Sequence, residues 1–308
     1  MDKIPPHRLG FAVKVLGDGG LKSHDSRRWQ SGPHLSRSLE LLDAIFDYLD
    51  RNDLRVYRLS SSTIPYGTHP DLPLFDYRRQ LEECGDAVTA LGAKARRLGL
   101  RLSTHPGQYT VVNSPDAEIA RKALLDLEQD TALLDALGAG PEAVVVVHVG
   151  GAYGDRRAAL ERFARAWERL SDAAKARVVI ENDEACFDVA DALELHLRLG
   201  VRVVFDWHHH RCKAAAELSD PAEALAAAYA TWPSDVRPKV HLSSPRTAFD
   251  ERGRAPRLDQ HADFVTPWDL LAVLQAAPGP VDVMLEAKAK DLAVLWLRRQ
   301  LSRNARAA

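Results

Sequence analysis

The chain has 308 residues, of which 46% are hydrophobic and 27% charged, as in soluble globular proteins. It has no run of the ~18–20 apolar residues that a membrane span needs, and its first residues, MDKIPPHRLG, lack the apolar core of a secretory signal. Its three widely spaced cysteines, without a CxxC pair, fit a reducing compartment. We therefore expect a cytoplasmic protein without disulfides or structural zinc. The formal charge of −2 excludes a global basic field, so attraction to nucleic acid would have to be local or come from bound metal.

Strand-like and helix-like segments alternate along the whole sequence. The β-branched or aliphatic runs that predict strands are 8–15, 54–60, 100–105, 143–148, 177–181, 201–206, 239–242 and 281–286. The amphipathic segments that predict helices are 36–51, 77–98, 116–138, 155–175, 187–199, 214–231, 267–276 and 288–303. Helix N-caps are expected at Ser114-Pro115-Asp116, Asp220-Pro221 and Thr266-Pro267.

Eight units of strand followed by helix predict an α/β protein whose parallel sheet closes into a (β/α)8 TIM barrel. A doubly wound open sheet is the alternative, and it normally carries a glycine-rich phosphate turn after the first strand. Here Gly17, Gly19 and Gly20 follow the first strand without GxGxxG spacing. We see neither a domain boundary nor an internal repeat, so we expect a single domain over residues 1–308.

Metal-binding residue types recur at the carboxyl ends of the predicted strands. Charged and imidazole side chains are costly there unless something compensates them, and a cluster of divalent metal ions would compensate them all at once. A carboxylate that can bridge two ions, with histidines around it, is the layout of a multi-metal hydrolase. Oxygen and imidazole ligands without thiolate suit Mn²⁺, Zn²⁺, Mg²⁺ or Fe²⁺ and do not choose among them. The residues are His105, His148, Glu181, Asp206, His209, His241, His261 and Glu286.

The richest of these clusters is the segment FDWHHHR. His208 and His209 cannot both point inward in regular geometry, but Asp206 and an imidazole three residues on can share a metal if a helical turn follows. We expect His210 and Arg211 to face outward. Further along the chain, Lys239 and His241 stand two apart on a strand and so share one face. A lysine among carboxylates is either a charge partner or chemically modified.

Seven motifs, in this order along the chain, resemble the UV damage endonuclease family, whose members are barrel relatives of apurinic endonuclease IV. They are YRLSSSTIPYGTHP (57–70), STHPGQYTVVNSP (103–115), HVGG (148–151), ENDE (181–184), FDWHHHR (205–211), KVHLSS (239–244) and LEAK (285–288). The resemblance runs from about residue 8 to residue 290. It implies a DNA repair endonuclease that cleaves the phosphodiester immediately 5′ to a pyrimidine photodimer, leaving 3′-hydroxyl and 5′-phosphate ends.

The resemblance also implies a cofactor of two or three Mn²⁺ ions, with Zn²⁺ or Mg²⁺ as alternatives. It assigns His105 and His148 to one metal shared with Glu181, which bridges to a second metal. The ligands of the second metal are Asp206, His241 and Glu286, and those of a third are His209 and His261. Lys239 matches a lysine that can be carboxylated in relatives. Glu181, Lys239 and Glu286 are the implied catalytic residues.

The implied partner is UV-damaged double-stranded DNA, with neither a membrane nor an obligate protein partner. Gln108 and Tyr109 match the pair that probes the lesion and the bases opposite it, and His69 lies in a matching motif. The resemblance is weaker near the N-terminus, where Phe11 and Val15 stand in place of an expected tyrosine and an expected polar residue. Phe11 keeps a ring that could stack on DNA.

The arginines can be interpreted in two ways. Arg246, Arg252, Arg254 and Arg257 are either a solvated loop or, in a nuclease, part of the phosphate-binding surface. Three others, Arg96, Arg97 and Arg101, end a predicted helix or begin a predicted strand. We therefore expect them at the opposite end of the strand–helix unit, exposed to solvent.

Two other functions compete with the nuclease. A xylose-isomerase-like sugar isomerase or epimerase would use similar ligands in a small pocket without aromatic wedges, whereas the segment HPGQY and the arginines favour nucleic acid. A metal-stabilised binding scaffold is disfavoured, because folding does not require an open, hydrolytic ligand set.

Overall fold

The computed structural model describes residues 7–107 and 109–304. Its eight strands follow one another around a closed barrel in chain order, which confirms the predicted (β/α)8 fold. The strands are β1 Arg8–Ala12, β2 Val56–Arg58, β3 Arg101–Thr104, β4 Val144–His148, β5 Val178–Glu181, β6 Arg202–Asp206, β7 Lys239–Leu242 and β8 Asp282–Leu285.

Helices connect successive strands, as the alternating pattern predicts. The α-helices are α1 Leu35–Arg51, α2 Tyr77–Glu83, α3 Gly85–Arg97, α4 Ala117–Ala136, α5 Arg156–Trp167, α6 Asp172–Arg177, α7 Val189–Leu199, α8 Trp207–Cys212, α9 Pro221–Tyr229, α10 Pro267–Ala276 and α11 Lys290–Asn304. Short 3-10 turns are formed by Trp29–Ser31 and Pro73–Phe75. Within the described residues, no helix is both long and apolar enough to cross a membrane.

The chain divides into two compact units. The first takes in Met1–Ala12 and Glu181–Ala308. In it, β6, β7 and β8 pair in parallel, and β8 also pairs with β1. The guanidinium of Arg8 on β1 donates two hydrogen bonds to the buried carboxylate of Asp282 on β8, at 2.8 and 2.5 Å. This bidentate pair ties the amino ends of the two strands together, opposite to the ends where the predicted ligands stand.

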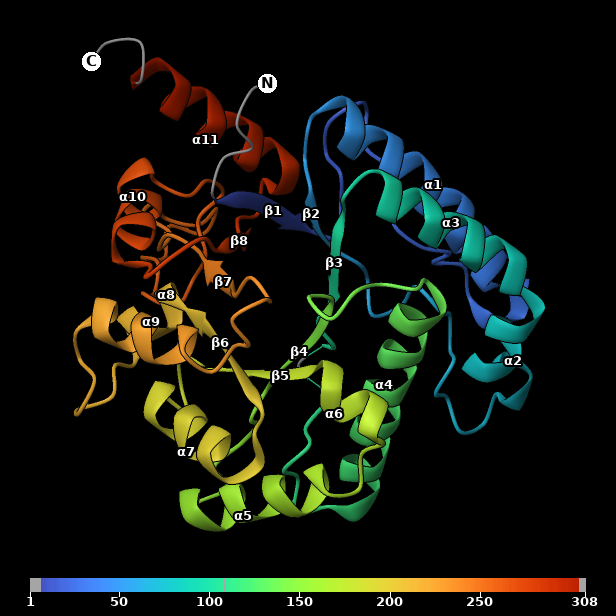
Figure 1. Ribbon diagram of the computed structural model, residues 1–308, viewed down its shortest axis with the longest axis horizontal. Helices are drawn as coiled ribbons and strands as arrows, with labels where there is room; N and C mark the ends of the chain where they lie inside the picture. The colour runs from blue at the N-terminus through green and yellow to red at the C-terminus, as the bar shows by residue number, and fades with distance from the viewer. Residues whose placement is uncertain (1–6, 108, 305–308) are drawn as a thin grey trace. The chain divides into compact units, whose positions relative to one another are not determined.

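The second unit is Val13–Ile180. Here β2, β3 and β4 pair in parallel, and α1 lies beside α3 (Figure 1). The single helix predicted over 77–98 is two helices, because the chain bends at Cys84 between α2 and α3. The first strand ends at Ala12 rather than at residue 15, since Val13 takes a positive φ of 64° that a β-strand cannot continue.

The predicted N-caps are confirmed. The side chains of Asp116, Asp220 and Thr266 accept hydrogen bonds from backbone N–H groups in the first turns of α4, α9 and α10. Each cap contributes about 1 kcal/mol by satisfying a donor that the helix itself leaves unpaired. Together they fix where three of the helices begin.

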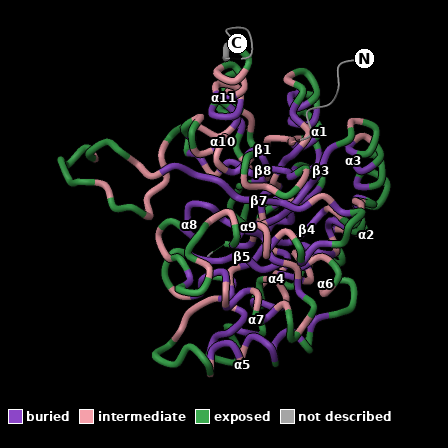
Figure 2. The backbone as a smooth tube through the Cα atoms, turned by 60° about the vertical axis from the view of Figure 1, so that its left-hand side comes forward, coloured by how far each residue is buried: buried purple, intermediate pink, exposed green. Residues whose placement is uncertain are grey.

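The core is formed by the strands and the inner faces of the helices. Figure 2 shows β7 and β8 in the colour of buried residues, and all four residues of each are buried. The prediction that Arg101 is solvated is wrong: it is 1% exposed, and its Nε donates to the backbone oxygen of Glu142 at 3.0 Å. As the first residue of β3, it places its guanidinium against the loop before β4, where a carbonyl oxygen compensates for its burial.

Candidate metal centre

The first unit gathers carboxylates and imidazoles at the carboxyl ends of its strands. Glu181 ends β5, Asp206 ends β6, His241 is the third residue of β7 and Glu286 directly follows β8. The parallel register places Asp206 beside His241. Glu181, Asp206 and His241 are completely buried. The alternation of helix and strand therefore delivers these side chains to one region, as the sequence predicts.

Two overlapping groups of ligand atoms meet at Glu181. One atom each from Glu181, Asp206 and His209 can be chosen so that all three lie within 4.8 Å of one another, and the same holds for Glu181, His241 and Glu286. His241 Nδ1 is 2.8 Å from Glu181 Oε1 and 3.4 Å from Glu286 Oε1. Because Glu181 belongs to both groups, its carboxylate is positioned to bridge two cations.

A short helix brings Asp206 and His209 together. Asp206 is the N-cap of α8, and its carboxylate accepts a hydrogen bond of 2.7 Å from the backbone N–H of His209. The helical turn that the spacing of these two residues requires is therefore present. The same turn buries His210, whose ring lies against Phe205 and whose Nε2 is 3.3 Å from the backbone oxygen of Ser219. The prediction that His210 faces outward is wrong, because this turn of the helix directs the His210 side chain toward Phe205 and Ser219 rather than toward solvent.

His208 is also buried, yet it stands apart from the carboxylates. Its ring centroid lies 6.5 Å from that of His209 and 5.3 Å from that of His261. Burial lowers the pKa of His208 to about 4, with help from the neighbouring His261 and His209. Thus both histidines are inside the protein, but His209 alone of the two belongs to the carboxylate group, in agreement with the predicted pairing of Asp206 with His209.

Backbone carbonyls orient two of the predicted histidine ligands. His209 Nδ1 is 3.0 Å from the oxygen of Asn182, and His261 Nδ1 is 2.9 Å from the oxygen of Glu286. A carbonyl oxygen only accepts hydrogen bonds, so Nδ1 carries a proton in both rings, and Nε2 is the nitrogen that could bind a metal. Metal-binding histidines in proteins commonly have this arrangement, in which one ring nitrogen binds the metal and the other is held by a carbonyl or carboxylate.

The electrostatics of the centre reflect an excess of negative charge. Burial raises the pKa of Asp206, and the nearby carboxylates of Glu181 and Glu286 raise it further. For His209, burial lowers the pKa, but the surrounding acids, Asp206 first among them, outweigh burial and raise it to about 10. Buried acids of this kind need a positive partner. A set of hard oxygens and imidazoles fits divalent cations, and an ion bound to His209 would take the place of the second proton of its ring.

Sequence reasoning missed two members of this neighbourhood. Asn182 exchanges hydrogen bonds with the backbone of Asp206, accepting at 2.8 Å and donating at 3.0 Å. Glu184 reaches within 3.6 Å of His209 Nε2. Both lie in the segment ENDE, so the signal was present, but only Glu181 could be placed at a strand end.

In the second unit, two predicted ligands lie together. The ring centroids of His105 and His148, at the ends of adjacent strands, are 5.2 Å apart. The Nδ1 of His105 is 3.1 Å from the backbone oxygen of Pro106, the same kind of tautomer-fixing contact as in the first unit. Their assignment to a metal shared with Glu181 stays a prediction.

Comparison with known proteins agrees with these motifs. Residues 36–307 match the family model described as UV-endonuclease UvdE. The chain belongs to this family. A UV DNA damage endonuclease of Bacillus cereus (strain B4264) is 33% identical over 269 residues, which cover 87% of this chain and 82% of that protein.

Solved structures lead to the same family. The crystal structure of SacUVDE superposes with a TM-score of 0.82 at 26% identity, covering 97% of this chain and 99% of that one. A D-psicose 3-epimerase from Clostridium cellulolyticum H10 reaches a TM-score of 0.53 at 12% identity, covering 91% and 85%. That second likeness shows a shared barrel fold alone. The sequence and the structure therefore both match the UvdE family, whereas the likeness to the sugar epimerase is limited to the fold.

The DNA-contact residues predicted from the UvdE family differ in their accessibility. Tyr109 is 84% exposed, and His69 is also exposed, with its Nδ1 accepting a hydrogen bond from the backbone of Asp71. Gln108 lies outside the described residues. Phe11 is completely buried in β1, so the predicted stacking of its ring on DNA is a misassignment for this structure. A strand residue whose side chain fills the core has no free face for a base.

Some of the arginines in the loop between β7 and α10 form ion pairs with acidic residues. Arg254 binds Asp250 at 2.7 Å, and Arg257 binds Asp259 at 2.9 Å. Arg252 is exposed and Arg246 is half-buried. Exposed pairs of this kind contribute little to stability, so these guanidinium groups can rearrange toward phosphates at low cost.

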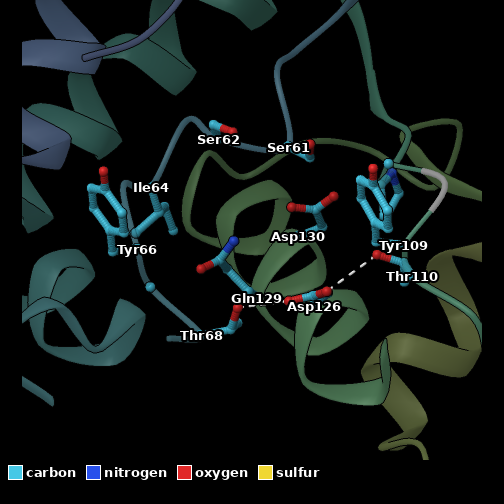
Figure 3. Close-up of a pocket in the computed structure, with 13 residues that line it drawn as sticks. Ser61, Ser62, Ile64, Tyr66, Thr68, Tyr109, Thr110, Asp126, Gln129 and Asp130 are labelled. Carbon is cyan, nitrogen blue, oxygen red and sulfur yellow. Dashed lines mark hydrogen bonds between the residues drawn. The ribbon is translucent and has the colours of Figure 1, made fainter. Parts of the chain in front are cut away.

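A cavity of about 220 Å³ opens in the second unit, beside Tyr109 (Figure 3). Its walls are the loop after β2, the loop after β3 and one face of α4, which contributes Asp126, Gln129 and Asp130. Nothing in the sequence analysis pointed to these three residues. Asp126 and Asp130 are four residues apart, one helical turn, and they occur within an amphipathic segment whose polar positions are normally solvated.

We expect Asp130 to make the stability of this UvdE-family protein depend on pH. Burial raises its pKa from 3.8 to about 8, although the polar side chains of Thr104 and Gln129 act in the other direction. Between these two pKa values the unfolded chain has lost a proton that the folded chain retains, so the free energy of unfolding should fall as pH rises from 4 to 8 and then level off. Asp130→Asn should remove this fall and stabilise the protein near pH 8 by a few kcal/mol.

Denaturant unfolding of both proteins between pH 4.5 and 9 measures the effect. Glu118→Gln, which neutralises an exposed carboxylate on the same helix, is the control and should keep the parental pH dependence. Parallel pH curves for Asp130→Asn and the parent would show that Asp130 is ionised in the folded protein at neutral pH.

Proposed function

We propose that this chain is a DNA repair endonuclease that hydrolyses the phosphodiester immediately 5′ to a UV-induced pyrimidine dimer, using two or three divalent ions, with manganese as the principal one. Membership in the UV-endonuclease UvdE family gives the reaction class. The observation that carries the multi-metal part is the pair of ligand groups that share the buried carboxylate of Glu181. A bridging carboxylate between two sets of ligands is what a two-metal phosphodiesterase requires.

The proposed ligand sets follow the family. His105 and His148 would hold one ion with Glu181, while Asp206, His241 and Glu286 would hold a second with the same glutamate; His209 and His261 would hold a third. Such ions, when bound, supply an activated water and neutralise charge on the phosphate oxygens.

The chain's own residues prepare this chemistry. The backbone oxygens of Asn182 and Glu286 fix the tautomers of His209 and His261, which presents Nε2 of each ring to a metal. Complete burial of Glu181, Asp206 and His241 keeps water from competing for their ligand atoms. Lys239, 1% exposed and on the same face of β7 as His241, is placed to change the charge of the centre according to its own chemical state.

DNA binding would depend on local features, because the chain has a formal charge of −2. The arginines Arg246, Arg252 and Arg254 would meet phosphates, which makes binding sensitive to salt. Tyr109 would stack in the gap left when the dimer leaves the helix, a step made cheaper by the weakened pairing of a dimer. Its 84% exposure leaves the ring available for such a contact.

Incision of irradiated plasmid tests the proposal directly. The protein with Mn²⁺ should convert UV-irradiated supercoiled DNA to the nicked form and leave unirradiated DNA supercoiled. EDTA should stop the reaction, and end-labelled oligonucleotides should show a cut directly 5′ to the dimer with 3′-hydroxyl and 5′-phosphate ends. Equal nicking of both plasmids would contradict the proposed specificity for damaged DNA, and activity that survives EDTA would contradict the metal mechanism.

Replacing Tyr109 with alanine should weaken binding to damaged duplex more than binding to undamaged duplex. The expected difference is ~1–3 kcal/mol, the contribution of one base–aromatic stack. Fluorescence anisotropy on both duplexes, with metal content measured alongside, provides the comparison. The control is Leu197→Ala, which removes another highly exposed apolar side chain, on α7. Equal losses on both duplexes would assign Tyr109 to ordinary backbone binding.

A further inference from the structure

One carboxylate in the first unit joins the two segments that carry His209 and His261. Asp269 lies in the first turn of α10, and 15% of its side chain is exposed. Its Oδ1 accepts a hydrogen bond from the guanidinium of Arg211, which stands two residues after His209 in α8. Its Oδ2 accepts a hydrogen bond from the hydroxyl of Ser244, just beyond the end of β7. Asp269 therefore connects α8 to the carboxyl end of β7.

Ser244 continues this connection to the loop that carries His261. The backbone oxygen of Ser244 accepts a hydrogen bond of 2.8 Å from the N–H of Ala262, the residue after His261. Ser244 is 1% exposed, so water does not compete for its hydrogen bonds. A chain of contacts thus begins two residues after His209, passes through Asp269 and Ser244, and ends one residue after His261.

The Asp269 carboxylate is itself held in place by Thr266. Its Oδ2 accepts a hydrogen bond of 3.0 Å from the Thr266 hydroxyl, and its backbone N–H donates to the same hydroxyl at 3.2 Å. The backbone N–H of Thr266 in turn donates to Ser244 Oγ at 2.9 Å. Hydrogen bonds to an ionised carboxylate are stronger than those between neutral groups. Asp269 is therefore the centre of a rigid network.

The separation of the two histidine rings depends on this network. The ring centroids of His209 and His261 are 6.0 Å apart, and the ring planes meet at 72°. Each ring is oriented separately, by a backbone oxygen that follows β5 for His209 and β8 for His261. His208 also packs against His261, with ring centroids 5.3 Å apart. A packing contact permits sliding, whereas the hydrogen bonds of Asp269 are directional.

We propose that Asp269 is a positioning residue that sets the separation of His209 and His261, and thereby the affinity of this pair for one divalent ion. The inference rests on the proposed function, in which these two histidines hold a third ion. Asp269 acts on the ion through Arg211 and Ser244, without touching it. Metal–ligand distances tolerate deviations of only about 0.2 Å, so a small shift of α8 against the loop should weaken binding.

Titration of the metal-free protein with Mn²⁺ tests this role, with free Mn²⁺ measured by electron paramagnetic resonance. Asp269→Asn keeps the shape of the side chain but loses the charge that holds Arg211. A pair of imidazoles without a carboxylate should be the weakest of the proposed sites. We expect its affinity to fall roughly tenfold, the lower end of the effect of changing groups that orient metal ligands, while the tighter sites keep their affinity. An unchanged titration would overturn the proposal.

A double variant locates the effect. His261→Ala should remove the weakest ion by itself, so adding Asp269→Asn should cause no further loss of Mn²⁺ binding if Asp269 acts through this pair. A further loss at the remaining sites would show a general effect on the fold and overturn the proposal. Arg211→Ala breaks the other side of the same contact and should reproduce the titration of Asp269→Asn. A parental titration for Arg211→Ala would contradict the link to α8.

The matched control is Asp220→Asn. Like Asp269→Asn, it neutralises a carboxylate at the start of a helix, where negative charge is favourable. Asp220 caps α9 and accepts its hydrogen bond from the N–H of Ala222 in that helix. This control should bind Mn²⁺ as the parent does. Loss of the same ion from Asp220→Asn would assign the effect to helix stability rather than to the position of the histidines.

The positioning role and the proposed function can fail independently. Asp269→Asn should need about tenfold more Mn²⁺ for half-maximal incision of irradiated plasmid, and saturating Mn²⁺ should restore most of the rate. A parental Mn²⁺ requirement would reject the positioning role and leave the endonuclease proposal standing, as would a parent protein that binds only two ions. A parent that binds three ions without incising irradiated DNA would reject the endonuclease proposal, while the titrations would still decide the role of Asp269.

Discussion

Replacing Glu181 with alanine should reduce incision of irradiated DNA by roughly 10³-fold or more, the scale seen when groups that act as a unit are broken. Glu181 belongs to both ligand groups, and its Oε1 is 2.8 Å from His241 Nδ1 and 3.6 Å from His209 Nδ1. Its removal would therefore take the shared carboxylate from both of the proposed cations at once. The remaining acids would no longer balance the charge of a full set of metal ions.

Metal content separates this effect from a loss of folding. Mass spectrometry of the purified Glu181→Ala protein should show fewer bound divalent ions than the parent, while circular dichroism should stay unchanged. Glu194→Ala is the matched control, since Glu194 is an exposed glutamate on α7 whose partner is Arg198. A Glu181→Ala protein with full activity would contradict a multi-metal mechanism, and equal losses in both variants would indicate a general effect on stability.

Lys239→Arg should be about as damaging as Lys239→Ala, with losses of roughly 100-fold or more, the effect of deleting one preorganised group at a reaction centre. We expect this because Lys239 is 1% exposed and shares a face of β7 with His241. A carboxylated lysine contributes negative charge there, which neither arginine nor alanine can supply.

The charge state of Lys239 can also be observed directly. Growth or incubation with ¹³C-bicarbonate should give a carbamate signal in the carbon spectrum of the wild type, and this signal should be absent from both variants. Removal of bicarbonate at low pH should lower the activity of the wild type reversibly. If Lys239→Arg keeps most of the activity, the side chain acts as a cation and the carbamate assignment is wrong.

The sequence predicts the cluster of acids and histidines at the strand ends better than it predicts the exposed loops. Strands and helices alternate regularly in a barrel, and the carboxyl ends of all strands lie on the same face. Each acid or histidine that ends a hydrophobic run could therefore be assigned to that face. The position of His209 followed from a spacing of three residues after Asp206 together with the expected helical turn. Burial of His210 could not be inferred in the same way, because it depends on what packs beside α8.

The cavity residues escaped prediction for a different reason. Asp130 occupies a helix position that would be solvated in most proteins, and here the loops after β2 and β3 lie over it. Loop conformation depends on long-range contacts such as that between Thr68 and Asp126, which are 58 residues apart. Local periodicity carries no information about such contacts. The buried ring of Phe11 illustrates the same limit, because its strand was predicted but the direction of its side chain was not.

The carbonyl contacts of His209 and His261 have a consequence for the speed of metal exchange. Both acceptors are main-chain atoms at strand ends, so the rings keep their orientation whether or not an ion is present. An incoming ion would then meet ligands that do not need to rotate, and a departing one would leave no collapsed site behind. Ions should therefore load and exchange at rates set mainly by loss of their own hydration water. The ion in such a site would then follow the abundance of each ion, weighted by its affinity for oxygen and imidazole ligands.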